Sequence, residues 1–311
     1  MVLILILQFI LTPVISPLCI GIVKKIKAKF QNREGASIFQ PYRDIWKLMH
    51  KDEVISSDAS WVFRCAPFII FATTIIVGVN IPLFASFSLN GSTGDLLVVV
   101  YTLALGTFFL ALAGMDTGSA FGGFGSSREV TVSALAEGGF ILSLFTISLI
   151  IGTTNLFSIS NAEVLLVSEF FLPTVISFAG FFIVSLAETG RYPFDNPATH
   201  LELTMIHEAM ILEYSGKRLA LMEWAAANKF FIFIAMGANL FFPFGIAQSA
   251  DIVAILFGLT ALFLKTFILC AMVGIVESSM AKSRFFRLPD LLITSFILSA
   301  VAIGLVQIQS L

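Results

Sequence analysis

The sequence predicts an all-α polytopic membrane protein with about eight transmembrane helices and with short amphipathic helices in its cytoplasmic loops. Three observations predict this fold class. Of the 311 residues, 58% are hydrophobic and only 12% are charged, whereas soluble domains average about 25% charged residues. Apolar runs long enough to cross a bilayer recur along the chain. Lysine and arginine are confined almost entirely to alternate loops, as expected of a polytopic protein.

Eight apolar runs have roughly the 20-residue length that a helix needs to cross the hydrocarbon core. These runs lie at 2–22, 63–87, 95–114, 130–151, 170–187, 229–249, 252–275 and 291–309. The basic residues of the first run follow its apolar part, which is opposite to the order in a signal peptide, so we expect a retained helix. The runs leave room only for loops, and residues 1–311 are therefore expected to form a single integral membrane domain.

Positive charge is distributed on one side of the predicted membrane. Four polar loops lie at 23–62, 115–129, 188–228 and 276–290, and three short connections lie near 88–94, 152–169 and 250–251. All of the 18 lysines and arginines except Lys265 lie in or beside the polar loops. The positive-inside rule therefore predicts that these loops are cytoplasmic and that both termini lie outside.

The first polar loop is predicted to contain an amphipathic helix. It opens with the basic stem "KKIKAK", which is typical of a segment at the membrane surface. From Pro41 onward, apolar side chains recur at helical spacing, at Tyr42, Ile45, Trp46, Leu48 and Met49. Such a helix would lie on the membrane or under a partner subunit.

The second polar loop, "MDTGSAFGGFGSSRE", is rich in glycine and serine. No predicted strand precedes it and it lacks a GK[ST] sequence, so its glycines do not indicate a phosphate-binding loop. We expect a tightly packed loop that leads to Arg128 and Glu129 at the start of the fourth span.

The third polar loop contains the segment "PFDNPATHLELTMIHEAMILEYSG" at 193–216. Asn196 followed by Pro197 is a helix-start signal, and Ser215 followed by Gly216 is a stop signal. The sequence therefore predicts one helix over 197–214, too polar to cross a membrane.

The same segment carries acidic side chains and no lysine or arginine. Glu202, Glu208 and Glu213 point in different directions on the predicted helix, so they cannot form one catalytic pair. His200 and His207 would lie about 10 Å apart, too far for one metal ion. Because the segment has no positive charge of its own, we expect its acids to be accessible to protons and not paired in salt bridges.

Two ionisable residues lie inside predicted spans. Glu137 is the eighth residue of its run, about 12 Å along the helix, and Lys265 is close to the middle of the seventh run. A charge at that depth needs a partner or a hydrated cavity. Glu137 is either a structural acid or, as we favour, a proton-carrying group. Lys265 could pair with Glu137 or belong to another structural ion pair.

Several classes of site are not indicated by the sequence. The cysteines Cys19, Cys65 and Cys270 are widely spaced and form no CxxC or Cys/His pattern, so we expect no metal or iron–sulfur site in this chain. No nucleophile elbow, Walker motif or dinucleotide-binding motif is present. We therefore expect no catalytic residue in this chain and no nucleic-acid partner.

Five motifs together resemble one family. They are "QNREGASIFQPYRDIWKLMHKDEV", "GSSRE", "AETGRYPFD", "EYSG" and "FLKT". The chain resembles the NADH dehydrogenase subunit 1 family of respiratory complex I, and most closely its members in group 4 [NiFe] hydrogenases, such as formate hydrogenlyase subunit 4 and hydrogenase-4 component C. The resemblance covers essentially the whole chain.

The resemblance implies a membrane anchor, the heel of a complex I-like energy-converting complex. Such a subunit is not catalytic alone: it docks a peripheral electron-transfer arm and relays protons or charge through buried carboxylates. The relay is assigned to Glu137, Glu188, Asp195, Glu202, Glu208, Glu213 and Lys265. Docking of the arm is assigned to Arg43, Asp44, Arg128, Glu129 and Arg191. Glu188 also has a simpler interpretation, because acids at helix mouths are often merely solvated.

The resemblance also implies the partners and the location. We expect hydrogenase-like large and small subunits in the peripheral arm, antiporter-like membrane subunits, and the lipid bilayer of the cell inner membrane. The [NiFe] and iron–sulfur centres are expected in the partner subunits, with no cofactor in this chain.

Two departures from complex I bear on the choice of complex. The segment "NPATHLELTMIHEAMILEYSG" is longer than in complex I, and "NREGASIFQPYRD" replaces the complex I sequence in the first loop. Both affect the quinone chamber of that family, so they favour a hydrogenase-type complex. The alternative is a quinone-site subunit of an NADH- or other donor:quinone oxidoreductase, and a less favoured one is a stand-alone ion transporter.

Overall fold

The computed structural model describes residues 2–56, 58–86, 94–161, 168–196, 205–249 and 251–309, apart from the side chains of 2–5 and 168. Its helices are α1 (Val2–Phe30), α2 (Gln40–Met49), α3 (Trp61–Asn80), α4 (Leu96–Asp116), α5 (Ala120–Ile151), α6 (Leu156–Ser160), α7 (Ser168–Glu188), α8 (His207–Ile211), α9 (Gly216–Leu240), α10 (Ile252–Ser279), the 3₁₀ helix η2 (Phe285–Arg287) and α11 (Leu288–Gln309). Within the described residues, eight helices are long and apolar enough to cross a membrane. This confirms the predicted fold class and number of spans.

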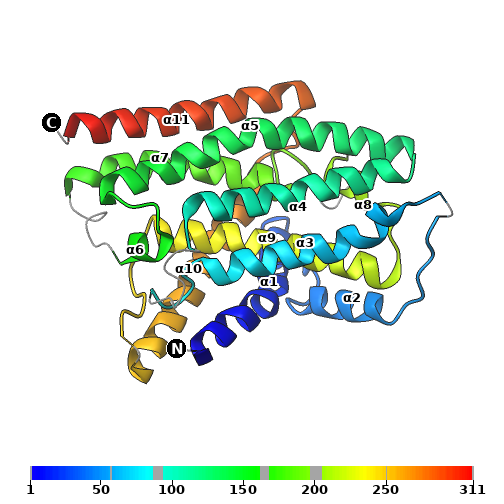
Figure 1. Ribbon diagram of the computed structural model, residues 1–311, viewed down its shortest axis with the longest axis horizontal. Helices are drawn as coiled ribbons and strands as arrows, with labels where there is room; N and C mark the ends of the chain where they lie inside the picture. The colour runs from blue at the N-terminus through cyan, green and yellow to red at the C-terminus, as the bar shows by residue number, and fades with distance from the viewer. Residues whose placement is uncertain are drawn as a thin grey trace.

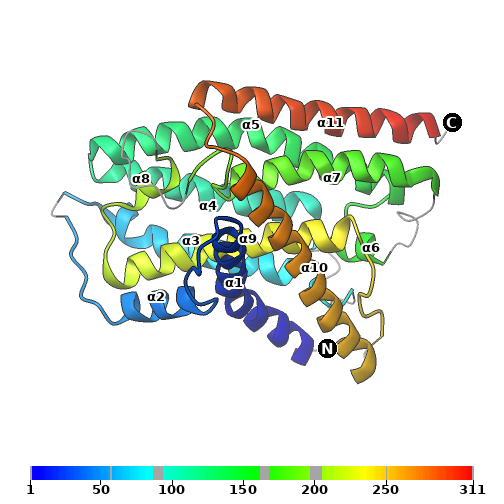
Figure 2. The ribbon, with the colours of Figure 1, turned by 180° about the vertical axis from the view of Figure 1, so that it is seen from behind.

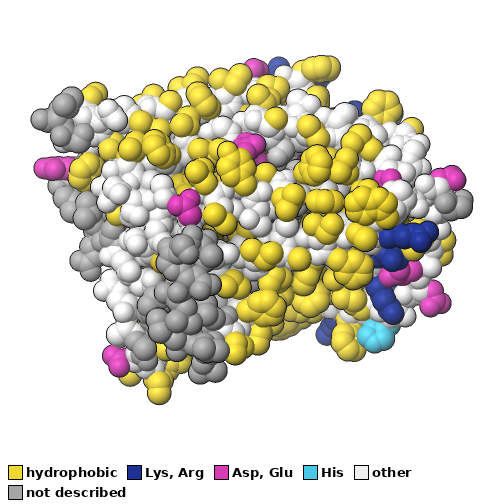
Figure 3. All heavy atoms as spheres, in the orientation of Figure 1, with side chains coloured by type: hydrophobic (Ala, Val, Ile, Leu, Met, Phe, Trp, Pro, Cys, Tyr) yellow, Lys and Arg dark blue, Asp and Glu magenta, His cyan; other side chains and the backbone are white. Residues whose placement is uncertain are grey.

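The long helices run roughly side by side, and α1 and α10 cross them obliquely (Figures 1 and 2). The short helices α2 and α8 lie at one end of the molecule, and α6 and the C-terminus lie at the other. Figure 3 shows that dark-blue lysine and arginine side chains on this face gather mainly at the end of α2 and α8, while apolar side chains cover the middle. We call this the basic end.

Small residues allow the outer helices to pack closely. Helices α5, α7 and α11 contact one another along their lengths. A Cβ added to Gly180 of α7 would lie 2.6 Å from Ser299 Oγ and 2.9 Å from the Ser295 carbonyl oxygen of α11. Close approach of this kind is the usual way in which helices associate in lipid, where no hydrophobic driving force brings them together.

Helix α9 forms the centre of the bundle. It packs against α1, α2, α3, α7 and α10. Its buried aromatic residue Phe233 contacts Phe140 of α5 at 5.1 Å and Phe181 of α7 at 6.1 Å between ring centroids. Because α9 is surrounded by other helices, its polar residues Asn228 and Asn239 are buried.

The predicted loop at 115–129 is wrong over most of its length, because α5 begins at Ala120. Its glycines mark close helix packing. A Cβ on Gly122 would lie 2.1 Å from the Gly114 carbonyl oxygen of α4, and one on Gly125 would lie 2.9 Å from Cβ of Ala209 in α8. The amphipathic helix predicted after Pro41 is confirmed as α2.

Two other predicted helix bounds are wrong. The sixth span is predicted at 229–249, but α9 covers Gly216–Leu240, because Lys229 is paired inside the protein and does not end the helix. Of the helix predicted at 197–214, residues 197–204 lie outside the described residues, and the rest is helical only over His207–Ile211. The described part of α8 starts where the Asp195 carboxylate accepts hydrogen bonds from the backbone.

Candidate functional site

A cavity of about 820 Å³ lies among the helices toward the basic end. Residues of α1, α2, α3, α4 and α9 form most of its wall, and α5, α7, α8, α10 and the segment 189–196 contribute single residues or short stretches. Its charged lining comprises Lys24, Lys27, Arg33, Asp44, Glu129, Glu188, Arg191, Asp195, Glu208, Glu223, Lys229 and Glu277, together with His207. Ile70, Leu103 and Leu110 supply part of the apolar wall. The cavity therefore combines both signs of charge with apolar surface.

Glu188 is ion-paired at the end of α7. Its Oε2 lies 2.8 Å from Nζ of Lys229 in α9, and Ser133 Oγ of α5 donates to its Oε1 at 3.3 Å. Lys229 Nζ also donates to Thr107 Oγ1 at 3.1 Å. Glu188 is therefore connected to three other helices, and it is not simply an acid solvated at a helix mouth.

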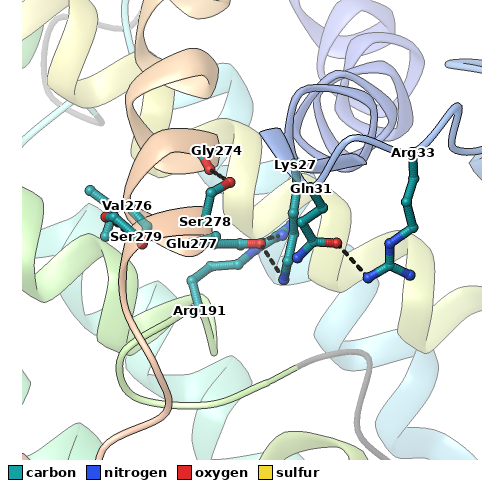
Figure 4. Close-up of polar contacts among 9 residues, drawn as sticks. All are labelled: Lys27, Gln31, Arg33, Arg191, Gly274, Val276, Glu277, Ser278 and Ser279. Carbon is teal, nitrogen blue, oxygen red and sulfur yellow. Dashed lines mark hydrogen bonds and ion pairs between the residues drawn. The ribbon is translucent and has the colours of Figure 1, made fainter. Parts of the chain in front are cut away.

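Glu277 joins two cations at the end of α10 (Figure 4). Its Oε1 lies 2.9 Å from Nη1 of Arg191 and its Oε2 lies 3.2 Å from Nζ of Lys27 in α1. The Glu277 side chain is only 2% exposed, against 6% for Arg191 and 19% for Lys27. Lys27 lies 4.4 Å from the ring centroid of Tyr192, which adds a cation–π contact. One buried carboxylate thus neutralises cations from two separate elements.

Asp195 is the buried acid of the segment after α7. Its Oδ1 lies 2.6 Å from Nζ of Lys282 and accepts from the Asn196 backbone N–H at 2.8 Å. Its Oδ2 accepts from the backbone N–H groups of Ile206 and His207 at 3.2 and 3.1 Å. The prediction that the acids of 193–216 are not salt-bridged is therefore wrong for Asp195, whose counter-charge comes from the loop after α10.

The two titratable residues of α8 line the cavity. Burial raises the pKa of Glu208 to about 7, with further increases from the charges of Glu223 and Asp195 and a smaller opposing effect of Lys24. Burial lowers the pKa of His207 to about 4, although the charge of Asp195 opposes this. Glu208 can therefore gain or lose a proton near neutral pH, whereas His207 is neutral there.

The predicted docking residues do not lie on one surface. Arg43 is exposed on α2, while Asp44 is half-buried, accepts from Gln40 Nε2 at 2.8 Å and lines the cavity. Arg128 is half-buried and donates to the Met205 carbonyl oxygen at 3.2 Å. Glu129 and Arg191 are buried and line the cavity. The last two are therefore interior residues: Glu129 lies on a buried face of α5, and Arg191 lies in the buried segment that follows α7.

The predicted relay residues are also divided. Glu188, Asp195 and Glu208 line the cavity. Glu137 is half-buried on α5, away from the described lining. Glu213 is exposed and outside the cavity lining, so the relay proposed below does not include it. Glu202 lies outside the described residues.

Lys265 does not pair with Glu137. Its Nζ donates to Asn239 Oδ1 at 3.2 Å and to the Phe242 carbonyl oxygen at 2.7 Å, both at the end of α9 that lies away from the basic end. Its partners in the described part of the chain are thus neutral acceptors, and the ion pair considered for it is wrong.

The sequence offers only a weak signal for the missed residues. Glu277 follows the apolar run "AMVGIV", as Glu188 follows "IVSLA", so an acid at the end of a span marks both positions. Lys27, Lys229 and Lys282 lie in basic loops or at their edges, where nothing in a single sequence distinguishes them from topology-determining charges. In the described ranges, no group of three His, Cys, Asp or Glu side chains could hold a metal ion.

Comparisons with known proteins agree with the motifs. The model of the family described as NADH dehydrogenase matches residues 1–308. Hydrogenase-4 component C of Escherichia coli K12 is 35% identical over 295 residues, covering 95% of this chain and 92% of the relative. Formate hydrogenlyase subunit 4 of the same organism is 29% identical, covering 87% of each chain. The NADH-quinone oxidoreductase H subunit of Paraburkholderia phymatum is 26% identical, covering 82% of this chain and 74% of the relative.

A solved structure shows the same fold. A chain of the membrane-bound sulfane sulfur reductase, an archaeal respiratory membrane complex, superposes with a TM-score of 0.85 over 97% of this chain and 98% of that chain. Sequence identity is 19%, so this likeness concerns the fold. The sequence matches confirm the resemblance that the motifs indicate.

Proposed function

The chain belongs to the NADH dehydrogenase family, and from this premise we propose that it is the membrane anchor of a complex I-like, hydrogenase-4-type, energy-converting complex. In this role it docks a peripheral electron-transfer arm and relays protons or charge toward antiporter-like membrane subunits. Oxidation and reduction take place in hydrogenase-like large and small subunits, which hold the [NiFe] and iron–sulfur centres. The complex lies in the cell inner membrane, with the basic end in the cytoplasm.

The cavity is the main evidence for the proposed proton relay. Carboxylates are costly in a membrane-spanning bundle and are usually functional where they occur. Here Glu129, Glu188 and Glu208 line one cavity, and α8 brings Glu208 there with a pKa of about 7. A group that titrates near the working pH is suited to proton transfer.

The row of acidic residues continues into the membrane along one face of α5. Glu129, Ser133 and Glu137 are spaced four residues apart, so they lie along one face of the helix. Ser133 donates to Glu188, which places Glu188 at the middle of this row. Glu137 lies about 12 Å beyond Glu129 along α5 and is half-buried, with no hydrogen bond or ion pair among the described residues. We assign it the outlet toward a neighbouring membrane subunit.

Helix α2 supplies the docking surface for the peripheral arm. None of its residues is buried, and Trp46 is 69% exposed beside the exposed Arg43. Tryptophan and arginine are the residue types most enriched in the binding centres of interfaces. Phe39 and Val54, at either side of α2, are also exposed. We include Arg43 and Asp44 in this surface, and we place Glu129 and Arg191 with the cavity.

A hydrogenase-type complex is favoured by the relatives. Identity and coverage are higher for hydrogenase-4 component C than for the NADH-quinone oxidoreductase relative. The cavity supports a second candidate, the quinone-site subunit of an NADH- or other donor:quinone oxidoreductase. Its volume of about 820 Å³ and its apolar walls suit a small molecule.

Purification of the chain with its partners from native membranes tests the anchor role and separates the two candidates. The hydrogenase-type proposal predicts that large and small hydrogenase-like subunits co-purify and that the preparation evolves hydrogen from a reduced electron donor. A bound quinone, together with quinone reduction that quinone-site inhibitors block, would establish the second candidate. Ion transport by the purified single chain would contradict both.

A further inference from the structure

The turn Arg191–Asp195, which follows α7, is held at both ends by side chains of other elements. Arg191 pairs with Glu277 at one end, and Asp195 pairs with Lys282 at the other. We propose that Asp195 is a positioning residue that fixes the start of α8, and with it His207 and Glu208 at the cavity, and that it does not itself carry protons. This assignment rests on the proposed function, because it removes one residue from the relay and gives it a supporting role.

The contacts of the Asp195 carboxylate support a fixed role. The residue is 2% exposed, and each carboxylate oxygen has two donors. An ionised carboxylate has about four acceptor positions and no donor. A proton added to either oxygen would replace an acceptor by a donor and would displace at least one of the four partners. Carrying a proton would therefore release Lys282, the backbone N–H of Asn196 or a backbone N–H at the start of α8.

The other end of the turn provides a rigid support. Glu277 of α10 binds Arg191 and also Lys27 of α1, as Figure 4 shows. The backbone N–H of Ser283 donates to the Pro193 carbonyl oxygen at 2.9 Å, so the segment after α10 follows the turn along its length. Displacement of the turn would break the buried Arg191–Glu277 ion pair with α10, and such pairs are costly to break.

In the part of the chain that the structure describes, the polar contacts at the start of α8 are those of Asp195 and the Arg128 hydrogen bond to the Met205 carbonyl oxygen. The apolar side of α8 packs on glycines: a Cβ added to Gly114 of α4 would lie 3.1 Å from Met210 Cβ, and one on Gly125 of α5 would lie 2.9 Å from Ala209 Cβ. Apolar packing alone permits a short helix to rotate or fray at its first turn. The two hydrogen bonds from Asp195 restrain that turn, and this keeps Glu208 in the cavity lining.

Hydrogen–deuterium exchange of the full chain in lipid nanodiscs tests the restraint directly. Asp195→Asn keeps the size of the side chain but removes its charge and one acceptor oxygen. We expect exchange of the Ile206 and His207 amides to become at least about ten-fold faster, as for loss of hydrogen bonds to a charged group. Exchange within α5 should not change. Glu213→Gln, which alters an exposed acid two residues beyond α8, is the control and should leave both regions unchanged.

Lys282→Gln is the second variant, in case Asp195→Asn does not fold. It leaves the carboxylate and its three backbone hydrogen bonds in place and removes only the ammonium group. We expect a smaller acceleration at the same two amides. Unchanged exchange at Ile206 and His207 in both folded variants would overturn the proposal.

The pH profile of ion movement in the assembled complex distinguishes positioning from proton carrying. The charged groups that act on Glu208 are Glu223 of α9, Asp195 of the turn and Lys24 of α1, and Glu129 of α5, which packs on α8, lines the same cavity. With Asp195 neutral, ion movement should persist and its pH midpoint should fall, because one negative neighbour of Glu208 is lost.

Two results would separate this inference from the proposed function. Complete loss of ion movement at every pH in Asp195→Asn, with normal exchange at α8, would identify Asp195 as a proton carrier and overturn the inference. If instead exchange at α8 rises while Glu188→Gln leaves ion movement normal, the positioning role stands and the proposed relay fails.

Discussion

Replacement of Glu277 by glutamine should destabilise the protein more than any other single neutralisation in the cavity wall. The uncharged glutamine side chain would leave Lys27 and Arg191 close together without the carboxylate that neutralises them. Removal of one partner from a buried ion pair costs about 3–5 kcal/mol. The Glu277 and Arg191 side chains are 2% and 6% exposed, so solvent cannot replace the lost charge. We expect a loss near the lower end of that range, because the glutamine oxygen still accepts one hydrogen bond.

Thermal unfolding followed by a thiol-reactive dye measures this loss. Cys19 and Cys270 are buried and should react only on unfolding, and the exposed Cys65 is first replaced by serine. Arg33→Gln is the control, since Arg33 is exposed and, among the described contacts, its guanidinium group bonds only Gln31 Oε1, at 2.7 Å. Such a surface change should be within about 0.5 kcal/mol of the parent. Adding Lys27→Gln to Glu277→Gln should recover part of the loss. Equal unfolding temperatures for the Glu277 and Arg33 variants would refute the reasoning.

Further expected outcomes concern pH and packing. The pKa of Glu208 is raised to about 7, so its contribution to stability is present below its unfolded pKa near 4.5 and is lost as the pH rises to 7. Glu208→Gln should therefore remove a fall in unfolding temperature between these pH values. An unchanged slope of unfolding temperature against pH would contradict the assignment. The lowered pKa of His207, about 4, means that its contribution is present above pH 6.5 and is lost as the pH falls to 4, so His207→Asn should flatten the acid side of the same curve. Gly180→Ala should cost about 1–3 kcal/mol by overpacking, because its Cβ would lie 2.6 Å from Ser299 Oγ, whereas Gly304→Ala, with nothing within 4 Å, should cost little; equal unfolding temperatures for these two variants would show that α7 and α11 are not closely packed.

The membrane-spanning helices could be predicted from the sequence because their signal is local. A window of about 20 apolar residues is sufficient to identify a span, and this holds for all eight. The predicted helix bounds were wrong where contacts with other helices determine where a helix begins or ends. Lys229 lies inside α9 because Glu188 of another helix neutralises it, and the glycines after Ser119 are helical because α4 and α8 pack on them.

The site could be predicted only in part, for the same reason. The acids Glu188 and Asp195 could be identified from the sequence, but their partners Lys229 and Lys282 lie 41 and 87 residues away. Glu277 and Lys27 are 250 residues apart, so no local pattern connects them. The helix signals at Asn196 and Pro197 do not predict the start of α8. This helix begins at His207, beside the Asp195 carboxylate. Ion pairs of this kind follow from the packing of the bundle, which a single sequence does not specify.

The most direct measurement of the central claim compares redox turnover with ion movement in membrane vesicles that contain the assembled complex. Glu188→Gln keeps the shape of the side chain at the centre of the acidic row, and Glu213→Gln changes an exposed acid as the control. The proposed relay predicts that the Glu188 variant assembles and retains redox turnover but loses coupled ion movement, while the Glu213 variant retains both. Normal ion movement in the Glu188 variant would contradict a relay through the cavity carboxylates.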